Sequence, residues 1–130
     1  MTAELSMLFW SAALMIVQML IAVSLVTLQV GLVPLAGNRE GLPEATGMAG
    51  RAGRAHRNMA ENLVLFAALV MVVHLGGMAN ETTALGAQIF FFARLVYAVV
   101  YLAGIPWLRT GMFLVSLAGI LMVASPMVMG

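Results

Sequence analysis

Residues 50–66 are GRAGRAHRNMAENLVLF. Three of the six arginines of the chain lie close together at the start of this stretch, and an uncharged apolar run follows its glutamate. A helix advances about 100° per residue, so four polar residues fall on one stripe: Arg51, Arg54, Asn58 and Glu61. The stretch therefore predicts a charged cluster at the point where a membrane helix begins.

The composition supports a membrane location for the whole chain. Of its 130 residues, 63% are hydrophobic and 8% are charged, whereas a soluble domain carries about 25% charged residues. A span needs roughly 20 residues, so the sequence predicts an all-α membrane protein, a single domain over residues 1–130 with four transmembrane helices. The predicted spans are about 5–35, 58–77, 84–104 and 108–128. Because the first apolar run is longer than the roughly 7–15 residues of a signal peptide, we expect it to be retained.

Several classes of chemistry find no support in the sequence. The chain has no cysteine, which excludes disulfides, a cysteine nucleophile and thiolate metal ligands. It contains no phosphate-binding glycine loop, no Ser/His/Asp set and no metal-ligand spacing. We therefore expect neither a metal nor a nucleic-acid partner.

The first apolar run is long for a single span. Residues 5–36 carry no charge, which as a helix corresponds to roughly 48 Å against a hydrocarbon core of about 30 Å. This helix must tilt, kink or protrude, and we expect it to end at Pro34 and Gly37. Gln18 lies inside the span, where a polar amide is expected to bond to a neighbouring helix.

The arginines indicate an orientation. Four lie in the first connection and the helix that follows it, at positions 39, 51, 54 and 57, and Arg109 lies in the third connection. The second connection has none, so the positive-inside rule places the first and third connections in the cytoplasm and both termini outside. This topology brings residues 51–61 and 101–109 to the same membrane face. The compactness of the chain favours a bacterial inner membrane.

A second stripe lies in the third span. Phe90, Arg94, Tyr97 and Tyr101 share one helical face. Arg94 is expected roughly 15 Å from the end of its helix, where a lone arginine needs a partner or a wet cavity. Glu61 is the one carboxylate expected within the spans, so a structural ion pair between Arg94 and Glu61 and a functional role both remain open.

Cationic groups outnumber carboxylates at this face. Five arginines, at positions 51, 54, 57, 94 and 109, face Glu61 alone. Guanidinium groups bind carboxylates and phosphates through two parallel hydrogen bonds, so the cluster favours a polyanionic small ligand. Tyr97 and Tyr101 are candidate donors to the same ligand. For Arg51 and Arg57 the alternative is an interaction with anionic lipid head groups.

The patterns RAHRNxxEN and FFxARxxYxxxYxxGxPxxRT, together with four spans, resemble the MAPEG family, the membrane-associated proteins of eicosanoid and glutathione metabolism. The resemblance implies a homotrimer with a glutathione site between protomers near the cytoplasmic face. It implies that Arg54, Asn58 and Glu61 hold glutathione from one helix, and that Arg94, Tyr97 and Tyr101 hold it from another. Arg109 is then placed to stabilise the thiolate, and Thr110 is a weaker candidate donor.

These observations lead to a ranked set of hypotheses. The first is a glutathione-dependent membrane transferase or peroxidase whose lipophilic electrophile or lipid hydroperoxide enters from the bilayer. The second is a non-catalytic lipid-binding or scaffold protein of the same fold. A small multidrug transporter is a third class, but such a pump needs a membrane carboxylate for proton coupling, and the first span has none inside.

Overall fold

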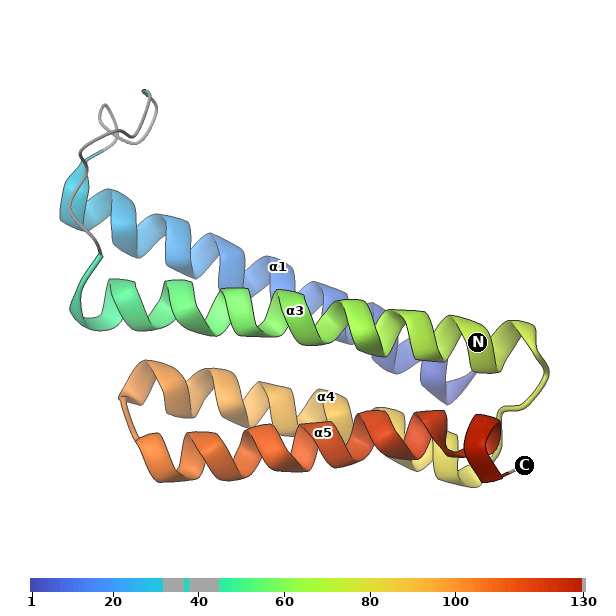
Figure 1. Ribbon diagram of the computed structural model, residues 1–130. Helices are drawn as coiled ribbons and strands as arrows, with labels where there is room; N and C mark the ends of the chain where they lie inside the picture. Colours follow the sequence, from blue (N-terminus) through green and yellow to red (C-terminus); the bar gives the residue numbers. More distant parts are fainter. Residues whose placement is uncertain (32–36, 38–44, 130) are drawn as a thin grey trace.

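The computed structural model describes residues 1–31, 37 and 45–129. Within this part of the chain lie four long helices, α1 (Ala3–Val30), α3 (Gly47–Leu75), α4 (Glu81–Ala103) and α5 (Pro106–Met129). They run side by side in a bundle whose two termini lie at the same end (Figure 1). Each helix is long and apolar enough to cross a membrane, so the prediction of four long apolar helices is confirmed.

The ends of the first two helices differ from the predicted ranges. α1 ends at Val30 because Gly31 adopts a φ of 102°, a conformation that favours glycine. Pro34, which was expected to end this helix, lies outside the described residues, as do Arg39 and most of the connection. α3 begins at Gly47, before the predicted span, so the whole arginine cluster is helical, as the stripe of residues 51–61 requires.

Side-chain hydrogen bonds join α1 to its neighbours at both ends. At one end, Gln29 Oε1 accepts from the backbone N–H of Thr46, the N-cap of α3, at 2.9 Å. At the other end, Glu4 Oε1 accepts from Thr83 Oγ1 at 2.7 Å. Thr83 itself forms a capping box with Asn80 at the start of α4.

Glu4, and not Glu61, is the carboxylate that the bundle buries. Glu4 is 4% exposed, whereas Glu61 is exposed. Glu61 therefore lies on the surface of the bundle, and the buried carboxylate among the described residues is one that the sequence did not single out. Glu4 lies in the first turn of α1, where the helix dipole favours a negative charge and Thr83 supplies a hydrogen bond.

The apolar core occupies the half of the bundle nearest the termini. The rings of Phe66 on α3 and Phe90 on α4 stack with centroids 4.0 Å apart. Next to these rings α4 and α5 approach closely. A Cβ atom added to Gly119 would lie only 2.6 Å from the carbonyl oxygen of Gly86. Small residues permit this kind of contact between membrane helices.

We predict that Gly119→Ala lowers the thermal unfolding temperature of the purified protein. The added methyl group would also lie 2.8 Å from the backbone nitrogen of Phe90, and overpacking of this kind costs about 1–3 kcal/mol. Gly111→Ala is the matched control in the same helix, since its Cβ meets nothing within 4 Å. The control should keep or raise the unfolding temperature, because alanine is the better helix former. Equal effects of the two substitutions would contradict the close contact.

Candidate functional site

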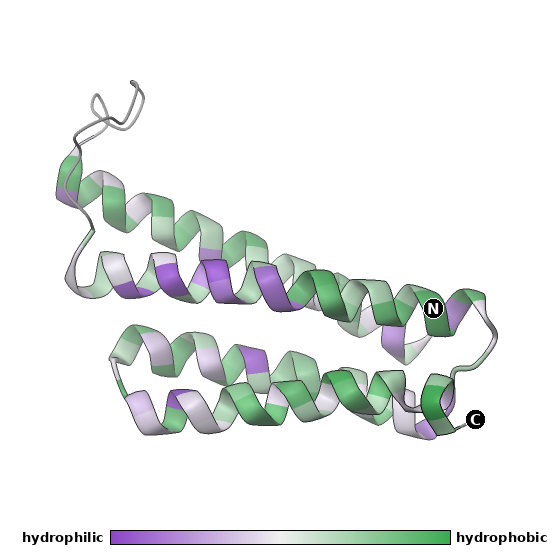
Figure 2. Ribbon diagram, in the orientation of Figure 1, coloured by the Kyte–Doolittle hydropathy of each residue, from purple (hydrophilic) through white to green (hydrophobic). Residues whose placement is uncertain are grey.

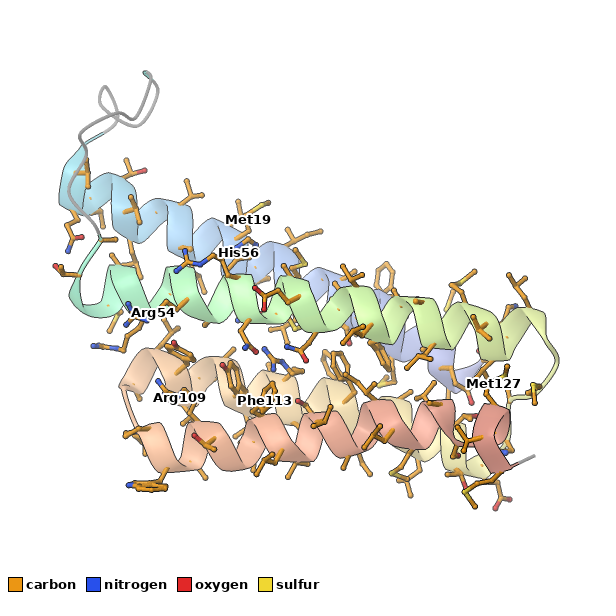
Figure 3. The ribbon with its side chains drawn as sticks, viewed as in Figure 1. Met19, Arg54, His56, Arg109, Phe113 and Met127 are labelled. Atoms are coloured by element: carbon orange, nitrogen blue, oxygen red, sulfur yellow. The ribbon has the colours of Figure 1, made fainter. Side chains whose placement is uncertain are left out.

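Polar side chains gather at the end of the bundle opposite the termini. Figure 2 shows that hydrophilic positions concentrate in the first half of α3, while the rest of the bundle is mainly hydrophobic. The second half of α4 and the start of α5 lie at the same end, and Figure 3 places Arg54, Arg109 and Phe113 there. Three helices thus contribute to one region.

Tyr101 links these three helices. Arg54 Nε on α3 donates to the Tyr101 hydroxyl on α4 at 3.3 Å. The Arg109 guanidinium on α5 lies over the Tyr101 ring, 4.7 Å from its centroid, a cation–π distance. The convergence of residues 51–61 with residues 101–109, inferred from the topology, is therefore present in the structure.

Arg94 is the most deeply buried charged side chain among the described residues. It is 1% exposed, and its guanidinium lies 4.0 Å from the centroid of the Tyr97 ring. Its three guanidinium nitrogens have no hydrogen-bond partner in the described part of the chain. The ion pair between Arg94 and Glu61, one of the two alternatives from the sequence, is thus not formed within the described chain. A buried charge is normally paired or hydrogen-bonded, so Arg94 has donor capacity left for an anion.

A pocket of about 170 Å³ opens beside these aromatic rings. Its lining comes from α3, α4 and α5 and consists of Asn58, Tyr97, Arg109, Thr110 and Phe113. The rings of Tyr97 and Tyr101 meet edge to face at 5.5 Å, which holds Tyr97 in place. The Thr110 hydroxyl donates to the carbonyl of Pro106 at 3.1 Å. Four of the predicted site residues therefore share one pocket.

The remaining predicted residues do not line this pocket. Arg51 Nε donates to the carbonyl of Leu102 at 3.1 Å, close to the C-terminus of α4, where carbonyl groups lack helical partners. Arg51 thus has a structural contact within the protomer. Arg57 and Glu61 are exposed and do not line the pocket.

Two residues that contribute to the site were missed from the sequence. Phe113 lines the pocket one helical turn after Arg109, so the spacing of four residues on α5 could have identified it. Asn62 Nδ2 donates to the backbone carbonyl of Asn58 at 2.8 Å and to its Oδ1 at 3.2 Å. Asn62 therefore orients the Asn58 side chain, a role that no sequence pattern indicated.

Comparison with known proteins identifies the family. No curated protein and no solved structure matches the chain. Residues 7–126 match the MAPEG family, and this range includes all of α3 and α4 and most of the other two helices. With a family match over this length and four helices able to cross a membrane, the chain is an integral membrane protein that belongs to the MAPEG family.

Proposed function

We propose that the protein is a glutathione-dependent membrane transferase or peroxidase. The MAPEG family includes enzymes with these activities. The observation that carries the proposal is the buried Arg94 guanidinium, whose three nitrogens lack partners beside Tyr97. An anionic ligand that reaches this point would satisfy donors that the described chain leaves free.

Glutathione fits the charges around the pocket. It offers two carboxylates and one ammonium group, and arginine pairs with a carboxylate through two parallel hydrogen bonds. Arg94 and Arg54 are the proposed carboxylate partners, with Arg51 and Arg57 as further cationic candidates. Glu61 is the proposed partner of the ammonium group. Asn58, Tyr97 and Tyr101 would supply neutral hydrogen bonds to the peptide.

The proposed chemistry requires a thiolate. A free thiol has a pKa of about 8.5, and a neighbouring guanidinium favours its ionised form. Arg109 lies in the pocket wall next to Thr110 and is the proposed stabilising group. Thr110 is the weaker donor, because its hydroxyl already donates to the Pro106 carbonyl. The thiol proton leaves to solvent, the sulfur forms a bond to the electrophilic carbon, and the leaving group departs with its electron pair. In the peroxidase reaction two thiols give a disulfide and reduce a hydroperoxide to an alcohol and water.

The exposed charges on α3 support a proposed homotrimer. Glu61 is exposed although it lies 14 residues before Leu75, roughly 21 Å along the helix and so within the depth of a 30 Å hydrocarbon core. A carboxylate that faces lipid at this depth costs several kcal/mol. A neighbouring protomer over this face would remove that cost and complete the site. In this proposal the pocket lies on the cytoplasmic side of a bacterial inner membrane.

We predict that Arg94→Met abolishes glutathione binding and stabilises the protein. Methionine keeps an unbranched, flexible stem, although it is two heavy atoms shorter, and it removes an unpartnered buried charge. Isothermal titration calorimetry should show at least a tenfold loss of affinity, because hydrogen bonds to charged groups contribute about 1.5–3 kcal/mol. The unfolding temperature of the ligand-free variant should rise. A lower unfolding temperature with unchanged affinity would instead mean that Arg94 forms a structural ion pair in the assembled protein.

We predict that Arg109→Ala retains glutathione binding but loses turnover. The loss of one group that stabilises a developing anion costs roughly 100- to 1,000-fold in rate. The rate of conjugation to an aryl halide, measured as kcat, should fall by this order while the calorimetric Kd changes little. Arg109→Lys is the matched control and should keep part of the rate, because it retains the charge without the planar fork. Equal kcat values for the wild type and Arg109→Ala would exclude Arg109 as the thiolate-stabilising group.

Calorimetry on the wild type separates the two leading hypotheses. We expect saturable glutathione binding that is lost in Arg94→Met. If the wild type binds no glutathione and instead retains fatty acids through purification without thiol-dependent turnover, the protein is a lipid-binding or scaffold member of the family.

A further inference from the structure

A second pocket lies in the middle of the bundle. It has a volume of about 150 Å³ and is bounded by α1, α3 and α4. Its lining is aliphatic except for one residue: Leu14, Val17, Gln18, Ile21, Ala52, Ala55, Leu95, Ala98, Val99 and Leu102. It shares no lining residue with the pocket beside Arg109, so it is a separate site.

Gln18 is the one polar side chain in this wall, and its carbonyl lacks a partner. The residue is 7% exposed, and its Oε1 atom is buried without a hydrogen bond in the described part of the chain. The bond to a neighbouring helix that the sequence led us to expect for this oxygen is therefore absent.

An amide oxygen without a hydrogen bond is unusual at the position that Gln18 has in the membrane. It lies near the middle of α1 (Ala3–Val30), roughly 20 Å from either end of the helix and thus close to the bilayer centre. Water is scarce at that depth, so an amide there obtains its hydrogen bonds from protein or from a molecule dissolved in the lipid. Several of the lining residues are exposed apolar side chains, among them Val17, Leu95 and Val99, so the pocket is accessible from the hydrocarbon phase.

The size and chemistry of the pocket define its ligand. A dry apolar cavity of about 150 Å³ in another protein binds benzene, so the space here suits a single ring. A glutamine amide carries an acceptor at one end and a donor at the other, and half a turn of the amide exchanges them. A hydroxyl group both donates and accepts, so it can pair with either end. We propose that this pocket binds a ring-sized alcohol or phenol from the bilayer, with Gln18 as the group that recognises the hydroxyl.

The proposal can be tested by fluorine NMR on the purified protein in detergent. The probes are 4-fluorophenol and 4-fluorotoluene, which differ by a hydroxyl in place of a methyl group. After correction for partition into the micelle, the wild type should bind the phenol more tightly than the toluene by roughly 2- to 12-fold, the range of one net hydrogen bond. Gln18→Leu should remove this preference and leave binding of 4-fluorotoluene unchanged.

Two further variants complete the experiment. Gln18→Phe fills the pocket as well as removing the amide, so it should bind neither probe. Met19→Leu is the matched control, because Met19 is the next residue on α1, is exposed and lies outside the pocket (Figure 3). It should behave as the wild type does. The proposal is overturned if the phenol preference persists in Gln18→Leu, or if Gln18→Phe binds both probes. It is also overturned if the wild type shows no saturable binding, which would mean that lipid, detergent or a neighbouring copy already fills the space.

Discussion

The unpaired guanidinium of Arg94 is the constraint on which the site half of the bundle depends. A buried charge must be compensated, yet within the described chain this one meets only the face of Tyr97. A cation–π contact contributes about 0.5–2 kcal/mol, which is less than the roughly 2.5–3.5 kcal/mol of inserting arginine at the centre of a membrane helix. The deficit leaves a favourable place for an anion, and the neighbouring Arg54 and Arg109 contact the hydroxyl and the ring of Tyr101.

The two halves of the bundle differ in how their side chains pack. Toward the termini, stacked Phe66 and Phe90 and the contact between Gly86 and Gly119 bring the helices close together. At the opposite end the buried cluster is smaller and consists of Ala55, Tyr97 and Tyr101. Bulky aromatic rings and long arginine side chains there leave a pocket. The tightly packed half thus holds the helices together, and the polar half leaves space between its side chains.

The sequence predicted the helices and the convergence of the site better than the details of pairing. Helical periodicity placed Arg94, Tyr97 and Tyr101 on one face, and the topology brought Arg54 and Arg109 to them, because both depend only on spacing and on the number of spans. The burial of Glu4 and the exposure of Glu61 were not predicted, because the rotation of each helix about its axis is set by packing. The end of α1 at Val30, with Gly31 as its cap, was missed because the nearby Pro34 is the stronger sequence signal for the end of a helix.

Ala55 lies between the tyrosine cluster and the apolar pocket beside Gln18. On one side it packs in the cluster with Tyr97 and Tyr101, and on the other it lines the apolar pocket beside Gln18. A larger side chain would have to displace the tyrosines or fill the space next to the amide. The small residue therefore separates the cluster of Tyr97 and Tyr101 from the apolar pocket by a single side chain. Both regions also contain a buried polar group without a partner, Arg94 in one and Gln18 in the other. Among the described residues Ser11 Oγ and His56 Nε2 are also buried without a partner, but neither residue lines one of the two pockets. Gln18 lines the apolar pocket, and Arg94 lies over Tyr97, which lines the other. A ligand at either place would therefore satisfy a buried polar group.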